Sequence, residues 1–188
     1  EPGTVFYKMH EDGLLDIADE DTDRQMYSYT KKFLEENGYH RYEISNYCKK
    51  DRECKHNLVY WNLDDYIGIG LGASSYFEGA RFSNFPEMKK YQDIMYSDKT
   101  HNNMYSESYE KLTGKAKMEE FMFLGLRMTE GIQISEFYEK FGVTVNEVYG
   151  EVIKKYSDMK MLEINGENMK LTDKGVDVSN IIFADFIL

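Results

Sequence analysis

The sequence predicts an α/β fold that continues into a mostly helical, winged-helix-like C-terminal domain. Up to about residue 85, a helical segment is followed by two segments rich in strand-forming residues, which is the order of an α/β layer. From residue 117, three amphipathic helices, a hairpin and a last helix follow in the order of a winged-helix-like fold. The 188 residues, 41% hydrophobic and 15% aromatic, suffice for one domain or two small ones.

The first part of the chain supports the α/β layer element by element. Residues 1–18 are expected to form a loop or a short helix, because a proline–glycine pair lies near their start. The run from Asp19 has an acidic start, apolar residues at helical spacing and a stop at Gly38, so it predicts a helix. Arg41–Asn46 alternates and predicts a strand. "DYIGIGLGASSYF" (65–77) predicts a second, buried strand that ends in a glycine-rich turn.

The remaining residues support the helical domain. "EMKKYQDIM" predicts a short helix within a polar stretch, 86–116, that we expect to link two domains. After it, "KAKMEEFMFLGLRMTEG" predicts an amphipathic helix that ends at Gly131. Its apolar residues are expected in the core: Met118, Phe121, Met122, Leu124 and Leu126. Two more helices, a hairpin at "KMLEINGENMKLT" and a closing helix at "DKGVDVSNIIFADFIL" follow. The predicted domains are therefore 1–85, 86–116 and 117–188.

The composition disfavours several classes of partner. With 23 basic and 34 acidic residues the formal net charge is −11, which repels nucleic-acid phosphates and anionic lipids. Residues 117–188 carry 8 basic and 13 acidic side chains, a net of 8 − 13 = −5, so this domain is not expected to bind DNA. No apolar run approaches the roughly 18 residues of a membrane span. Two cysteines cannot form a disulfide framework, which favours the cytoplasm.

The densest group of chemically active side chains is "CKHNLVYW", residues 54–61. Cys48, Cys54 and His56, with the more distant His40, could offer ligands to zinc, but their spacing departs from the close cysteine pairs of structural zinc sites, so no metal site is expected. His56 could instead coordinate heme iron while neighbouring aromatic rings stack on the porphyrin. The alternative is a strand end whose histidine bonds a backbone carbonyl and whose aromatic residues fill the core.

Three glycines, Gly68, Gly70 and Gly72, follow this group. Glycine amides can approach and cradle an anion. A dinucleotide-binding loop, however, needs G-x-G-x-x-G at the start of a helix. Here the spacing is G-x-G-x-G, and "SSYFEGARF" after it reads as extended chain. The pattern therefore favours a tightly packed strand end over a phosphate loop.

Five motifs follow one another in an order that resembles a known family: "EPGTVFY", "YEISNY", "ECKHNLVYW", "DDYIGIGLGASSYF" and "FMFLGLRMTEGI". They resemble the oxygen-independent coproporphyrinogen III oxidases and their radical SAM relatives, and the resemblance runs from the first residue to the last. "HNLVYW" is similar to the HNxxYW signature of the HemW-type heme chaperone branch.

The resemblance implies a radical SAM barrel, a partial TIM-like barrel. In the family it holds a [4Fe-4S] cluster through C-x3-C-x2-C and S-adenosylmethionine through a glycine-rich motif. We expect both motifs to precede Glu1 in a longer protein, with the last part of the barrel in residues 1–85 of this chain. No cofactor is therefore expected here apart from possible heme, and the chain alone is not expected to act as an enzyme.

The resemblance also assigns candidate site residues. His56, Asn57, Tyr60 and Trp61 fall on the chaperone signature, so His56 is the candidate heme ligand. Glu43 would lie near the end of a barrel strand, where barrel enzymes place their chemistry. The alternative for Glu43 is a hydrogen-bonded structural carboxylate.

A second set of candidates falls on the glycine-rich segment. Gly70, Gly72 and Ala73 match a GxGA segment at the carboxyl end of the barrel, near the S-adenosylmethionine or substrate cavity. Many relatives have a histidine where this chain has Ser74, so no role of that imidazole carries over.

These assignments imply a function for the longer protein. The first expectation is a heme chaperone that binds heme or a porphyrin and delivers heme to an acceptor protein. The alternative is a true oxidase that decarboxylates two propionates of coproporphyrinogen III, and a third is an interaction or regulatory domain. Barrel edges left unpaired in this chain predict a dimer or a swapped arrangement.

Overall fold

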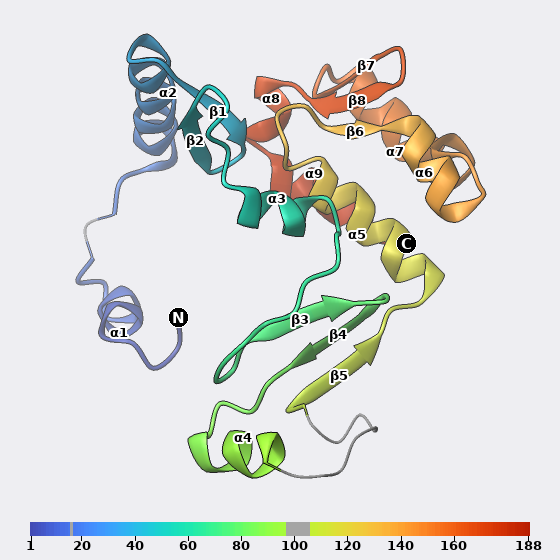
Figure 1. Ribbon diagram of the computed structural model, residues 1–188. Coiled ribbons are helices and arrows are strands. Elements are labelled where there is room, and N and C mark those ends of the chain that lie inside the picture. The colour runs from blue at the N-terminus through green and yellow to red at the C-terminus, as the bar shows by residue number, and fades with distance from the viewer. Residues whose placement is uncertain (16, 97–105) are drawn as a thin grey trace. The chain divides into compact units, whose positions relative to one another are not determined.

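The computed structural model describes residues 1–15, 17–96 and 106–188 (Figure 1). It is a mixed α/β structure whose strands form small sheets. The chain divides into two compact units, residues 1–40 and 41–188. Within the described ranges, no helix is both long enough and apolar enough to cross a membrane.

The first unit is helical, with α1 (Val5–Glu11) and α2 (Glu20–Glu36). The predicted helix after Asp19 is confirmed, and its start has a clear cause. The Asp19 carboxylate accepts a hydrogen bond from the backbone N–H of Thr22 at 2.7 Å, which caps the helix and lowers the pKa of that carboxyl. Three acidic residues in the first turn also favour the positive end of the helix dipole.

The second unit begins with short strands around one helix. Strands β1 and β2 form a two-stranded sheet, and α3 follows them. Strands β3, β4 and β5 form an antiparallel sheet in that order, with α4 between β4 and β5 in the chain. The bounds are β1 (Tyr39–Glu43), β2 (Asn46–Lys49), α3 (Lys55–Trp61), β3 (Ser74–Phe77), β4 (Ala80–Ser83), α4 (Met88–Met95) and β5 (Ser108–Lys111).

The rest of the second unit combines helices with a second three-stranded sheet of order β6-β8-β7. The predicted hairpin is confirmed as β7 and β8, in which Leu162 pairs with Leu171 and Ile164 with Met169. The expected closing helix is divided in two at Val178. The bounds are α5 (Gly114–Gly125), β6 (Ile132–Gln133), α6 (Ile134–Phe141), α7 (Val145–Asp158), β7 (Leu162–Asn165), β8 (Asn168–Leu171), α8 (Asp173–Val176) and α9 (Ser179–Asp185).

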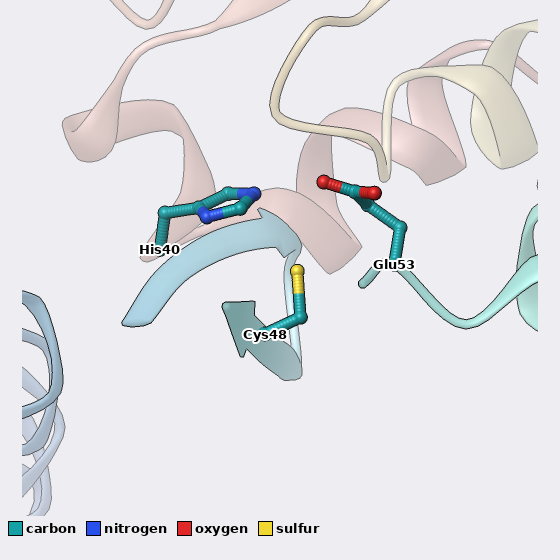
Figure 2. Close-up of side chains that lie close together, drawn as sticks. All are labelled: His40, Cys48 and Glu53. Carbon is teal, nitrogen blue, oxygen red and sulfur yellow. The ribbon is translucent and has the colours of Figure 1, made fainter. Parts of the chain in front are cut away.

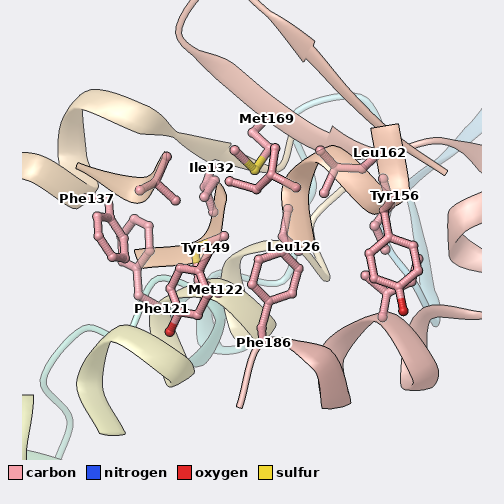
Figure 3. Close-up of a cluster of buried hydrophobic side chains, with 14 residues drawn as sticks. Phe121, Met122, Leu126, Ile132, Phe137, Tyr149, Tyr156, Leu162, Met169 and Phe186 are labelled. Carbon is pink, nitrogen blue, oxygen red and sulfur yellow. The ribbon is translucent and has the colours of Figure 1, made fainter. Parts of the chain in front are cut away.

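A cluster of buried apolar side chains joins these helices and this sheet (Figure 3). Phe137 is fully buried, and its ring packs against Phe121 at 5.6 Å between centroids and against Tyr149 at 6.1 Å. The helix predicted to end at Gly131 ends at Gly125 instead. Of its expected core residues, Phe121, Met122 and Leu126 are confirmed in the cluster, and Met118 packs against it. Leu124 is half-buried and lines a separate cavity described below.

Two segments differ from their sequence interpretations. "CKHNLVYW" is not a strand end, because Lys55–Trp61 form helix α3. The glycine-rich segment precedes strand β3 instead of ending it, and Ile67 and Ile69 within it are 58% and 88% exposed. Positive φ angles at Gly70 (104°) and Gly72 (64°) explain the second difference, because they break the extended conformation that a strand requires.

An ion pair between α7 and α9 makes one part of the stability dependent on pH. Asp185 accepts hydrogen bonds from Lys155 Nζ at 2.5 Å and Tyr156 Oη at 2.7 Å, and these bonds lower the pKa of its carboxyl below the ordinary 3.8. A lowered folded-state pKa gives stability that is present above the ordinary value and is lost as the pH falls through the folded one. Asp185→Asn should therefore reduce the drop in melting temperature between pH 7 and pH 3, and an unchanged drop would contradict this.

Candidate functional site

Helix α3 carries all four residues of the H-N-x-x-Y-W pattern. It is only seven residues long, and Cys54 at its start makes no capping hydrogen bond through its side chain. Residues four apart lie on one face of a helix. The pattern therefore gives α3 two faces, one with His56 and Tyr60 and the next with Asn57 and Trp61.

The first face presents an exposed imidazole held by a tyrosine. The Tyr60 hydroxyl and His56 Nε2 lie 2.8 Å apart, and the two rings meet edge to face at 4.8 Å between centroids. Neutral imidazole has one donor and one acceptor nitrogen, so it can hydrogen-bond through one nitrogen and coordinate a metal through the other. Coordination through Nδ1 would keep the Tyr60 bond, whereas coordination through Nε2 would replace it.

Tyr60 also connects this face to an aromatic cavity. Its ring packs edge to face on Tyr66 at 4.7 Å, and the backbone of Tyr66 bonds that of Tyr76 through two hydrogen bonds, of 2.7 and 3.0 Å. Burial raises the pKa of both Tyr66 and Tyr76. We call the space that these residues enclose, about 190 Å³, the tyrosine cavity. It is lined by Tyr60, Trp61, Leu63, Asp64, Tyr66, Tyr76, Arg81 and Leu124.

The cationic side chain of the tyrosine cavity is already paired. Arg81 donates two hydrogen bonds to the Glu120 carboxylate, at 3.1 Å and 2.6 Å, and its guanidinium lies 5.3 Å from the centre of the Tyr76 ring. The hydrogen bonds to Glu120 raise the pKa of Arg81 further above its already high value. Arg81 and Glu120 thus join β4 to α5 as a neutral pair at the wall of the cavity.

The second face of α3 docks on the rest of the unit. Asn57 Nδ2 donates to the Tyr42 hydroxyl at 3.2 Å, and the Arg127 guanidinium lies 4.5 Å from the centre of the Trp61 ring. Arg127 Nη2 is also 3.7 Å from the Glu43 carboxylate. Arg127 is therefore held both by the charge of the Glu43 carboxylate and by the quadrupole of the Trp61 ring.

Backbone hydrogen bonds fix the same junction. The N–H of Ile44 donates to the carbonyl of Arg127, and the N–H of Thr129 to that of Tyr42, both at 3.0 Å. The segment after α5 thus lies antiparallel to the end of β1, with Glu43 opposite Met128. This arrangement ties α3 and β1 to the helical part of the unit.

Glu43 is a buried carboxylate at this junction. Its side chain is fully buried and accepts a hydrogen bond from Asn46 Nδ2 through Oε1. Within the described part of the chain, Glu43 Oε2, Arg127 Nε and Trp61 Nε1 are buried without a hydrogen-bond partner. These contacts favour the structural interpretation of Glu43, and its placement at a reaction cavity stays a prediction.

The glycine-rich segment is packed by its own neighbours. Asn84 Nδ2 donates to the carbonyls of Gly68 at 3.1 Å and Gly70 at 2.9 Å, and Gly72 N–H donates to the Phe85 carbonyl at 3.2 Å. A Cβ atom at Gly68 would lie 2.3 Å from the Ser74 carbonyl oxygen, so this position requires glycine. The backbone N–H groups that a phosphate loop would present are also engaged, because Gly68 N–H donates to Ser75 Oγ at 2.9 Å and Gly70 N–H to Tyr91 Oη at 3.3 Å.

Ala73 and Ser74 complete that candidate set. The Ala73 carbonyl accepts from the N–H of Asn84 at 2.9 Å, and Ser74 opens β3 opposite Ser83. Ser74 is exposed. The role of this segment at a cofactor or substrate cavity stays a prediction.

The two cysteines differ in environment. Cys48 is buried and Cys54 exposed. Burial, and then the neighbouring Glu53 carboxylate, raises the pKa of the Cys48 thiol, so the nucleophilic thiolate is disfavoured. Figure 2 shows the side chains of Cys48 and Glu53, both in the second unit.

Neither cysteine fits the cluster chemistry that the resemblance implies. A [4Fe-4S] cluster in this family needs three thiolates at C-x3-C-x2-C, and this chain holds two cysteines, with five residues between them. Among the described residues, Cys54 and His56 also belong to no group of three potential metal ligands. No step of a reaction is therefore assigned to an iron–sulfur cluster on these residues.

Sequence reasoning missed four residues of this site: Tyr66, Arg81, Glu120 and Arg127. Arg81 and Glu120 lie 39 residues apart in the sequence, and Arg127 lies 66 positions after its partner Trp61. Only Arg127 could have been noticed in the sequence, because it is a charged residue at the end of an apolar helix within the motif "FMFLGLRMTEGI". A charge in that position needs a partner when it is half-buried.

Comparison with known proteins shows which proteins the chain is similar to. The HemN C-terminal domain family matches residues 112–178. The whole chain is 37% identical over 188 residues to the heme chaperone HemW of Lactococcus lactis subsp. lactis (strain IL1403), covering 48% of that protein. It is 34% identical over 187 residues to the heme chaperone HemW of Bacillus subtilis (strain 168), again covering 48%. The chain thus spans about half the length of these curated relatives.

A solved structure shares the fold. The chain matches coproporphyrinogen III oxidase (HemN) from Escherichia coli, described as a radical SAM enzyme, with a TM-score of 0.68 over 92% of this chain and 42% of that one. The two sequences are 16% identical. At that identity the match shows a common fold alone.

Proposed function

We propose that the chain binds heme with His56 as a ligand of the iron, because it is similar over its length to two HemW heme chaperones and matches the HemN C-terminal domain over residues 112–178. The proposal extends to the longer protein, which would pass the heme to an acceptor protein. The observation that carries it is the position of His56: exposed, on a helix whose other face is anchored, and oriented by Tyr60.

This arrangement suits a ligand that must be released again. An exposed imidazole lets an acceptor approach the iron, whereas a deeply buried one would hold the heme. The Tyr60 hydroxyl restricts rotation of the ring, and hydrogen bonds of this kind to ligating histidines orient the ring and tune its basicity. The Trp61–Arg127 contact keeps α3 in place while its first face binds and releases heme.

The fold match supports a finer assignment of the domains. We propose that residues 1–85 are the last part of a radical SAM barrel, 86–116 a linker and 117–188 a winged-helix-like domain. The element order from α5 to β8, with its three-stranded sheet, supports the last of these. The radical SAM cofactors would be bound by other parts of the longer protein.

The oxidase alternative has less support. The likeness to the Escherichia coli oxidase is one of fold at 16% identity, whereas the identity to the two chaperones is 37% and 34%. Decarboxylation of coproporphyrinogen III by the longer protein, measured with the full set of cofactors, would favour the oxidase instead.

A heme titration followed at the Soret band tests the proposal. We expect saturable binding by the chain, and His56→Ala should weaken it at least tenfold, which corresponds to about 1.4 kcal/mol. His10→Ala is the matched control, since His10 is also exposed and lies in the last turn of α1, and its affinity should stay within twofold. Equal binding by the chain and by His56→Ala would contradict the proposal.

A further inference from the structure

The tyrosine cavity has a mostly apolar wall. Aromatic rings from α3, from β3 and from the segment before β3 line it together with Leu63 and Leu124. Of its two charged lining residues, Arg81 is neutralised by Glu120 and stacked on Tyr76, while Asp64 is exposed. Burial of an unpaired charge in such surroundings is costly. The occupant that fits is therefore an uncharged, apolar group.

The position of the cavity identifies what that group belongs to. Tyr60 contributes to both sites, because its hydroxyl bonds His56 while its ring lines the cavity. A flat ligand whose metal is bound by His56 would therefore lie beside Tyr60 and next to the cavity that Tyr60 lines. Heme carries vinyl and methyl groups on one edge and two ionised propionates on the opposite edge. Only the vinyl-bearing edge matches the apolar wall.

A larger cavity nearby is less suitable. It encloses about 390 Å³ on α3, α5, β6 and α6, and shares Trp61 and Asp64 with the tyrosine cavity. Its charged lining residues are Asp64, Glu136, Glu139 and Lys140, an excess of two negative charges that repels propionates. Neither His56 nor Tyr60 lines it.

We propose that the tyrosine cavity receives the vinyl-bearing edge of a heme coordinated by His56, with the propionates left in solvent. This rests on the proposed function and adds a determinant of specificity to it: the chain distinguishes porphyrins by the substituents of one edge. Tyr60 is then the positioning residue that links the iron ligand to the cavity.

The experiment compares two iron porphyrins on the chain. Iron protoporphyrin IX has two vinyl groups, and iron deuteroporphyrin IX has hydrogen atoms in their place. We expect the protoporphyrin to bind about tenfold more tightly, equal to about 1.4 kcal/mol, because a buried vinyl group leaves water. In Leu124→Phe, whose larger side chain fills the cavity, the ratio should fall to about one. A thermal unfolding curve checks that this variant folds.

The outcomes separate the two proposals. Binding that depends on His56 but is indifferent to the vinyl groups in the unmodified chain would overturn the cavity assignment and leave His56 as the ligand. A vinyl preference that persists in the folded Leu124→Phe variant would also overturn it. Absence of binding that depends on His56 would overturn the proposed function and, with it, the placement of the heme edge.

Discussion

Arg127→Met should destabilise the chain by about 3 kcal/mol, since removing one partner of a buried ion pair leaves the other charge uncompensated. Glu43 is fully buried, and Arg127 Nη2 at 3.7 Å is the cation facing it. Methionine keeps part of the apolar contact with Trp61 but loses the charge. Urea unfolding followed by Trp61 fluorescence measures the change, because this tryptophan is the only one in the chain.

The matched control is Glu43→Gln. It keeps an oxygen for the Asn46 hydrogen bond and leaves the charge on Arg127, whose side chain is 26% exposed and can be solvated. We expect Glu43→Gln to lower the free energy of unfolding by less than half as much as Arg127→Met does. The double variant should then be more stable than Arg127→Met alone, because neither charge remains. A loss of unfolding free energy below 1 kcal/mol for Arg127→Met would mean that the contacts of Arg127 with Glu43 and Trp61 do not hold the junction.

Phe137→Ala should lower the free energy of unfolding by about 3–5 kcal/mol, which is usual when a buried phenylalanine is truncated. Its ring has no exposed surface and lies among Phe121, Phe141 and Tyr149, so the rigid neighbours cannot close the cavity that it leaves (Figure 3). Denaturant unfolding of the variant measures the loss.

Tyr138→Ala is the control on the same helix. Tyr138 adjoins Phe137 on α6 but is 57% exposed, so its truncation should change the unfolding free energy by less than about 1 kcal/mol. Similar losses for the two variants would show that the cluster does not depend on the Phe137 ring.

The longer regular elements could be predicted because several local signals agreed. Helix α2 has an aspartate cap and an acidic first turn, and α7 has Thr144 and Glu147 as a reciprocal capping box. The hairpin of β7 and β8 has its turn at Gly166, whose φ of +64° suits glycine. In each case the information lies within a few residues, so the sequence alone is sufficient.

Helix α3 could not be predicted in this way. Its seven residues include Val59, Tyr60 and Trp61, which favour strands in isolation, and a helix this short is not stable by itself. The helix forms because both of its faces are held by residues outside it, Tyr66 on one side and Tyr42 and Arg127 on the other. Tertiary contacts override local preference here.

The candidate site could be predicted only in part, because it also depends on tertiary contacts. The sequence singled out His56, Tyr60 and Trp61 together. It did not indicate the division of their helix into one face that presents the histidine and another that packs on the rest of the unit. That division depends on Arg127, which lies 66 positions after Trp61, and on the cavity that β3, β4 and α5 complete. Side chains brought together across such distances leave no pattern in a single sequence.

The most direct test of the account is the identity of the iron ligand. Electron paramagnetic resonance of the ferric heme complex, with all histidines labelled with ¹⁵N, reports whether a histidine nitrogen is bound to the iron through its hyperfine coupling. We expect this coupling in the unmodified chain and in His10→Ala, and its loss in His56→Ala. Coupling that survives His56→Ala, or that is absent from the unmodified complex, would contradict the assignment of His56.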